Sequence, residues 1–312
     1  MQLYKSRDFS AFFQDTFAFL KQNGKHYFKH YFKVNGIFLM ILMVLGYFFT
    51  KFYSELLFGG ILQNNPNAMD DYMNDNLGLF ILLLFVFLTV GLIAGIISYA
   101  YTAIYLKLYI KNNGSNFNTK AIIESYKANI GKLFVFLLCG LLIAFPILIV
   151  SGIVMFVLAI TIIGLLLLPL VIGAISLFYN MTLMEYIEHK KGIWDSFGYA
   201  WTLLMSKFWT AVGSVGLFFL MGYLVQNVIT LIPYVFGMAR LFTTIESGSN
   251  TTQDIGGTMM VIMLIVFFIT FVVGSILNNI VQLNQGIVFY SLKEDQENIN
   301  TKSIIDQIGS GE

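Results

Sequence analysis

The side chains best suited to chemistry in this apolar chain lie in the stretch SILNNIVQLNQG, which starts at residue 275. At steps of three and four it places Ser275, Asn278, Gln282 and Gln285. These steps fall on one face of a helix. Amides facing lipid are costly, so this face is expected to meet protein or a wet cavity, with Gln226 and Asn227 as candidate partners. Two roles stay open: hydrogen bonds between packed helices, or a polar groove for a lipid headgroup or a small solute.

The residue types that enzymes use are scarce. Of three histidines, His26 and His30 have a spacing that metal ligands can have, but the neighbouring Lys25, Lys29 and Lys33 repel a cation. Contact with lipid headgroups is therefore the expected role of both histidines. The sequence contains no P-loop, dinucleotide-binding fingerprint or HExxH motif. We predict no enzyme activity, no catalytic residue, no metal and no cofactor.

The elements that must position the amides are membrane spans. The chain is 57% hydrophobic and 11% charged, against about 25% charged residues in soluble domains. A span needs about 20 apolar residues, and uncharged runs cover Leu77–Leu106, Leu133–Met184, Phe208–Ala239 and Ile255–Leu292. The second run is long enough to fold back near Ala159–Gly164. With a first span at Val34–Ser54, the sequence predicts an all-α polytopic membrane protein with six spans.

The basic residues predict which side of the membrane each connection occupies. All but two of the 18 lysines and arginines fall in the N-terminal segment, in the connections 107–132 and 185–207, or in the tail. Only Lys51 and Arg240 lie on the opposite side. By the positive-inside rule, both termini and these two connections are predicted to be cytoplasmic.

Two similar segments, NTKAIIESY at 118–126 and NTKSIIDQI at 300–308, indicate an internal repeat. We predict one membrane domain, 1–312, built from three units at about 8–107, 115–187 and 193–292, followed by an amphipathic tail at 293–312. Each unit would be an amphipathic helix in the plane of the membrane followed by two spans. We predict two of these in-plane helices at 119–130 and 193–206. The alternative is ordinary loops with chance periodicity. The apolar stripes behind this prediction are Ile122, Ile123, Tyr126 and Ile130; Ile193, Phe197, Ala200, Trp201, Leu204 and Phe208; and Ile304, Ile305 and Ile308.

Lysines that border the amphipathic stretches predict contact with anionic lipid headgroups on the cytoplasmic face. They are Lys21, Lys25, Lys29, Lys33, Lys132 and Lys207. In the second span, Gly91 and Gly95 form a small-xxx-small pair, which predicts close helix packing. The expected partners are membrane lipids, with a possible membrane-protein partner and no nucleic acid.

The segment EYIEHKKGIWDSFGYAWTLLMSKFWTAV, from Glu185, carries a resemblance. It resembles a bacterial superfamily that includes the membrane domain of some glycerophosphodiester phosphodiesterases and six-span proteins of the YciC type. The shared pattern is a span that ends in Glu, a Gly, an amphipathic helix, then Lys and an aromatic residue before a new span. The resemblance implies an all-helical fold in a bacterial inner membrane. It does not imply phosphodiesterase activity, which belongs to a separate soluble domain.

Two classes of function are open on this evidence. The first is a non-enzymatic membrane module, either a subunit of a membrane complex or a scaffold that organises lipids. The second is a transporter or flippase-like protein for a lipid or small solute. The amide face separates them, because a transporter needs it to line a cavity and a scaffold needs only packed, hydrogen-bonded side chains.

Overall fold

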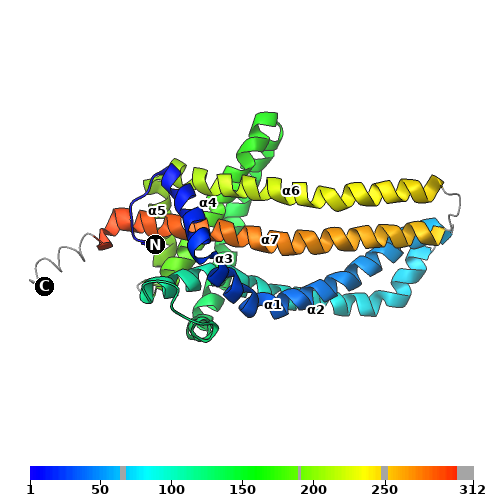
Figure 1. Ribbon diagram of the computed structural model, residues 1–312, viewed down its shortest axis with the longest axis horizontal. Helices are drawn as coiled ribbons and strands as arrows, with labels where there is room; N and C mark the ends of the chain where they lie inside the picture. The colour runs from blue at the N-terminus through cyan, green and yellow to red at the C-terminus, as the bar shows by residue number, and fades with distance from the viewer. Residues whose placement is uncertain (64–67, 189–190, 247–251, 301–312) are drawn as a thin grey trace, which may run out of the picture. The chain divides into compact units, whose positions relative to one another are not determined.

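A computed structural model describes residues 1–63, 68–188, 191–246 and 252–300, and all regular structure in them is α-helical. Six of the helices are long and apolar enough to cross a membrane. The predicted all-α fold with six spans is confirmed, and the chain is an integral, multi-pass membrane protein. The helices are α1 Phe9–Gln63, α2 Ala68–Lys111, α3 Thr119–Ala159, α4 Ile162–Ile187, α5 Ile193–Ser206, α6 Phe208–Glu246 and α7 Thr252–Glu297 (Figure 1).

The chain forms two compact units that do not follow its order. The first contains Met1–Val34, Ile96–Met221 and Asn278–Glu312, and the second contains Asn35–Gly95 and Gly222–Leu277. Helices α1, α2, α6 and α7 each run through both units, whereas α3, α4 and α5 belong wholly to the first. The predicted three-unit repeat stays a prediction, and Ile304, Ile305 and Ile308 lie outside the described residues.

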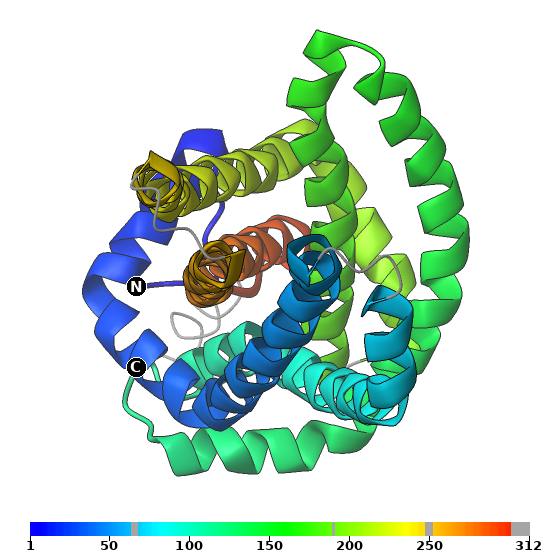
Figure 2. The ribbon, with the colours of Figure 1, turned by 90° about the vertical axis from the view of Figure 1, so that its right-hand side faces the viewer.

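Two predicted in-plane helices are continuous with the spans that follow them. Helix α1 has no break near Val34, and α3 runs without a break from Thr119, where the side chain of Asn118 accepts a hydrogen bond from the Ala121 amide. Ending a helix leaves backbone groups without partners. A glycine inside a helix costs only about 1 kcal/mol, so Gly24 and Gly131 do not interrupt them. Figure 2 shows that α3, coloured teal to green, instead bends along its length.

Helix α5 is separate, with the predicted bounds 193–206, and it ends at Lys207, whose backbone is not helical (φ −140°, ψ 51°). Its predicted apolar stripe is divided in the structure. Phe197, Ala200 and Leu204 are buried in the first unit, whereas Trp201 is exposed. Trp201 belongs to a second apolar face, which also contains Trp194 and Met205. An orientation of α5 along the membrane surface stays a prediction.

The turn between the third and fourth spans lies where it was predicted. Helix α3 ends at Ala159, and the hydroxyl of Thr161 caps α4 by accepting a hydrogen bond from the Gly164 amide at 2.9 Å. Pro146 and Pro169 lie inside α3 and α4. Pro233 also lies inside a helix, so it does not end the fifth span.

Two glycines allow a close crossing of α4 and α6 in the first unit. A Cβ atom on Gly173 would lie 3.1 Å from the backbone nitrogen of Gly216, so the two backbones almost touch. The predicted pair in α2 does not make such a crossing. A Cβ atom on Gly91 would meet only Leu42, at 4.0 Å, and one on Gly95 would meet nothing within 4 Å.

Membrane topology can be tested with single cysteines in a Cys139→Ser background. We expect a membrane-impermeant thiol reagent added outside to label Asp70→Cys and to leave Asn116→Cys unlabelled until the membrane is opened. Both positions are exposed, so access to the reagent reports the side of the membrane and not burial. The reverse labelling pattern would mean that the termini face outward.

Candidate functional site: the buried polar column of α7

The last turns of α7 form the centre of the first unit. Every residue from Val281 to Glu294 is buried, so the helix is covered on all sides (Figure 2, orange to red). A helix covered all round is normally apolar. This one contains several amides and a lysine. We call its buried polar residues the polar column: Asn279, Gln282, Asn284, Gln285, Ser291, Lys293 and Glu294.

The first amides of the column bond to α1 and α2. The Thr102 hydroxyl donates to Oε1 of Gln282 at 3.2 Å. The Tyr27 hydroxyl lies 2.6 Å from Oγ1 of Thr102 and donates to Oδ1 of Asn279 at 3.2 Å. All four side chains are buried. One side chain from α1 and one from α2 therefore donate to the oxygens of these two amides.

The next two amides, Asn284 and Gln285, bond to side chains of α1, α6 and α4. Nδ2 of Asn284 donates to Thr16 of α1 at 3.0 Å and to Ser214 of α6 at 3.1 Å. Nε2 of Gln285 donates to Ser176 of α4 at 2.7 Å. The amides thus connect α7 to four surrounding helices, which is the arrangement expected of hydrogen bonds that hold a bundle together.

The predicted amide face is correct in part. Gln282 and Gln285 are buried, but Asn278 is exposed and Ser275 is half-buried. Asn279 and Asn284, which lie off that face, are central instead. A single-face pattern fails here because α7 is packed on every side beyond residue 280, so burial no longer follows the helical period.

The predicted partners of the amides bond elsewhere. Nε2 of Gln226 donates to the Thr270 carbonyl at 3.3 Å, and Nδ2 of Asn227 donates to the Tyr223 carbonyl of its own helix at 2.7 Å. Both contacts lie within the second unit, whereas Gln282 and Gln285 belong to the first. A groove built from all of these residues stays a prediction.

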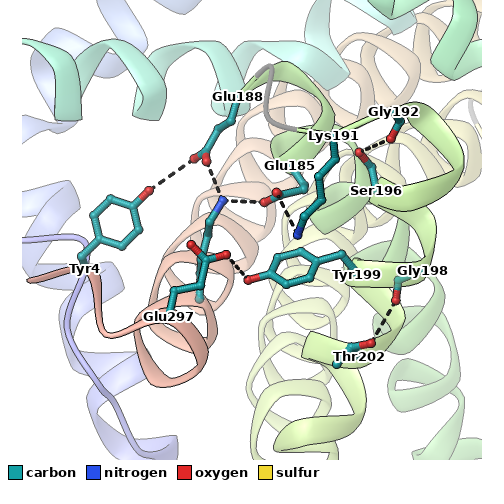
Figure 3. Close-up of polar contacts among 11 residues, drawn as sticks. Tyr4, Glu185, Glu188, Lys191, Gly192, Ser196, Gly198, Tyr199, Thr202 and Glu297 are labelled. Atoms are coloured by element: carbon teal, nitrogen blue, oxygen red, sulfur yellow. Dashed lines mark hydrogen bonds and ion pairs between the residues drawn. The ribbon is translucent and has the colours of Figure 1, made fainter. Parts of the chain in front are cut away.

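The column ends in an ionic cluster, formed by Glu185, Glu188, Lys191 and Lys293, of which Glu185 and Lys293 are buried. Nζ of Lys293 lies 2.5 Å from a Glu185 oxygen and 2.6 Å from a Glu188 oxygen. Lys191 lies 3.3 Å from the other oxygen of Glu185, as Figure 3 shows. Glu185 thus also pairs with a lysine of the turn that follows α4. Sequence reasoning missed Lys293, although its charge at the end of the sixth span complements those of the two glutamates.

Two tyrosines border the ionic cluster (Figure 3). The Tyr4 hydroxyl donates to Glu188 at 3.4 Å, and the Tyr199 hydroxyl donates to Glu297 at 2.5 Å. Burial, and then the negative charge of Glu188, raises the pKa of Tyr4. Burial, and then the hydrogen bond to Glu297, raises the pKa of Tyr199. Both hydroxyls therefore stay protonated and act as hydrogen-bond donors, not as bases.

The segment before α1 is fixed against the same end of the bundle. Arg7 is buried and donates to the carbonyls of Gln2, Leu3 and Lys5, and its Nε lies 2.8 Å from the Asp15 carboxylate. These bonds fold the segment into a compact loop, which brings Tyr4 to Glu188.

Two lysines predicted to contact lipid headgroups bind protein groups. Lys132 donates to the Tyr186 carbonyl at 2.5 Å, close to where Lys107 donates to the Ile187 carbonyl at 2.6 Å. These carbonyls lie at the C-terminus of α4, where the helix dipole favours cations. Lys207 lies 2.7 Å from the Asp295 carboxylate. Lys21, Lys25, Lys29 and Lys33 are exposed on α1.

The two paired histidines also bind protein, contrary to the prediction that they contact headgroups. His26 lies 2.9 Å from the Phe117 carbonyl and 2.8 Å from the Tyr105 hydroxyl. His30 lies 2.7 Å from the Thr119 hydroxyl. They hold the connection between α2 and α3 against α1.

The amide and charged side chains at this end of the bundle bond to protein groups. Glu185 and Glu188 are paired with lysines, and Glu294 accepts hydrogen bonds from the backbone amide of Asn300. Each of the four buried amides of the column makes at least one hydrogen bond. Within the ranges that the structure describes, no three His, Cys, Asp or Glu side chains are grouped to hold a metal ion. No family model matches the chain, and neither a curated protein nor a solved structure is significantly similar to it.

Proposed function

We propose that this protein is a non-enzymatic module of a bacterial inner (cytoplasmic) membrane, with both termini cytoplasmic, and that it organises anionic lipids at the cytoplasmic face. The observation that carries the proposal is a row of four exposed lysines on α1, Lys21, Lys25, Lys29 and Lys33, which we call the lysine ladder.

The spacing and the neighbours of the ladder lysines suit contact with a membrane surface. Its lysines are spaced by four residues, so they follow one side of the helix. The exposed rings of Phe17 and Phe32 lie on the adjoining part of that side. The opposite side contains Tyr27 and Tyr31, which are buried in the first unit. Basic residues beside exposed aromatic rings are typical of helices that contact anionic headgroups with one part and acyl chains with another.

A transporter for a lipid or small solute is the second candidate. One observation favours it: both amide atoms of Asn180, and Oε1 of Gln285, are buried without a hydrogen-bond partner in the part of the chain that the structure describes. A polar solute would satisfy such atoms. Against it, the amides of the polar column are buried and bonded to four surrounding helices, which supports a closed core.

The ladder predicts a measurable lipid preference. We expect the purified protein, titrated with phosphatidylglycerol or phosphatidylethanolamine in detergent, to bind the anionic lipid more tightly in native mass spectrometry. Replacing all four ladder lysines by glutamine should weaken phosphatidylglycerol binding at least tenfold, because each basic residue contributes about 1 kcal/mol at an anionic surface.

The matched control removes the same charge elsewhere. Lys5, Lys111, Lys120 and Lys127 are also exposed and lie off the ladder, so their replacement by glutamine should keep most of the preference. Equal lipid binding by the ladder variant and the unchanged protein would refute the proposed function.

A further inference from the structure

We propose that a groove between α3, α4 and α6 holds one acyl chain of a phospholipid. This inference rests on the proposed role in lipid organisation and adds a second, different lipid site. The groove has a volume of about 690 Å³, and apart from Ser151 its lining is entirely apolar. The residues used below are Pro146, Val150, Val154, Ala174, Trp201 and Trp209.

The backbone of the first unit produces the groove. Gly173 and Gly216 bring α4 and α6 into backbone contact, and Ala174, next to the crossing, is too small to fill the adjacent space. Pro146 removes a backbone hydrogen bond inside α3. Helix α3 therefore curves past α4, as Figure 2 shows, and the space between them is lined by side chains of both.

Tryptophans mark the depth of the groove in the membrane. The three tryptophans of the chain are Trp194, Trp201 and Trp209, with exposed fractions of 58%, 56% and 77%. Exposed tryptophan is enriched where headgroups meet hydrocarbon. Trp201 and Trp209 line one part of the groove, and the rest is lined by the apolar spans α3 and α4. The groove thus extends from headgroup level into the hydrocarbon layer.

This position and size fit an acyl chain better than a partner helix. A spanning helix about 10 Å wide and 30 Å long occupies on the order of 2,000 Å³, which exceeds the groove volume. At the tryptophan end, Lys207 is already paired with Asp295. The site therefore selects the acyl chain and not the headgroup charge, which distinguishes it from the lysine ladder.

The test fills the groove with a side chain. We expect the protein, after extensive washing in detergent, to retain one phospholipid in native mass spectrometry, whether its headgroup is phosphatidylglycerol or phosphatidylethanolamine. Val150→Phe should weaken this retention at least tenfold. Ile149→Phe is the matched control, because residues 149 and 150 are neighbours with exposed fractions of 51% and 63%, and only Val150 lines the groove.

A second readout uses tryptophan fluorescence in a Trp194→Phe background, where only the two groove tryptophans remain. Quenching by phospholipids brominated in their acyl chains should fall in Val150→Phe and stay unchanged in Ile149→Phe. Equal retention and quenching in both variants would overturn the inference. A dimer that dissociates on Val150→Phe would also overturn it, since a second copy would then cover the groove.

The two lipid proposals fail separately. If the ladder variant loses its phosphatidylglycerol preference while no lipid is retained in the groove, the proposed function stands and the groove inference is wrong. If the groove retains a lipid while the ladder shows no preference, the proposed function is wrong.

Discussion

Replacing Lys293 by methionine should destabilise the protein by about 3–5 kcal/mol, the usual cost of removing one partner from a buried ion pair. The Lys293 side chain is fully buried and is the common partner of Glu185 and Glu188. Methionine has a similar length but no charge, so the substitution leaves two carboxylates facing each other at the centre of the unit. The melting temperature in detergent measures the loss.

Two further variants make this test specific. Lys207→Met removes a lysine whose salt bridge with Asp295 is partly exposed, and such pairs contribute about 0–1 kcal/mol. Adding Glu185→Gln and Glu188→Gln to Lys293→Met should restore part of the stability, because the uncompensated charge disappears. A triple variant no more stable than Lys293→Met would show that packing, and not charge, fixes Lys293.

Replacing Gly216 by leucine should destabilise the protein by at least about 1–3 kcal/mol, the cost of overpacking a tight contact. A Cβ atom there would lie 2.6 Å from Cδ2 of Leu170 and 3.3 Å from the Pro169 carbonyl oxygen. The carbonyl belongs to the backbone of α4, so it cannot move aside alone. Helices α4 and α6 would have to separate.

Gly152→Leu is the matched control for this steric effect. A Cβ atom on Gly152 would meet nothing within 4 Å, and leucine favours a helix over glycine by about 1 kcal/mol. We expect its melting temperature in detergent to stay level or rise. If Gly152→Leu and Gly216→Leu lower the melting temperature equally, the glycine crossing does not hold the helices together.

The features that could be predicted from the sequence are those that depend on residues close together in the chain. Uncharged runs gave the six spans, and Gly192 and Lys207 bracket α5 at its predicted bounds. The connections between helices were harder to predict. A polar, amphipathic stretch such as 119–130 has the pattern of a separate helix, even though the backbone of α3 continues from it into the span.

The candidate site could not be predicted fully from the sequence, because it depends on contacts between residues that are far apart in the chain. Gly173 and Gly216 belong to different helices, and each looks like an ordinary glycine in an apolar run. Asn278 and Asn279 are adjacent and chemically identical, yet one is exposed and the other buried. Only the packing of the surrounding helices makes that choice, and no local pattern encodes it.

The central position of α7 has a consequence for biosynthesis. A chain is made from its N-terminus at about 5–20 residues per second, so α7, the helix at the centre of the first unit, is made after α1 to α6. Until it enters, Thr16, Thr102, Ser176 and Ser214 lack the amides they bond in the finished protein, and Glu185 and Glu188 lack Lys293. Helices α1 to α6 are therefore made while these polar side chains still lack their partners on α7.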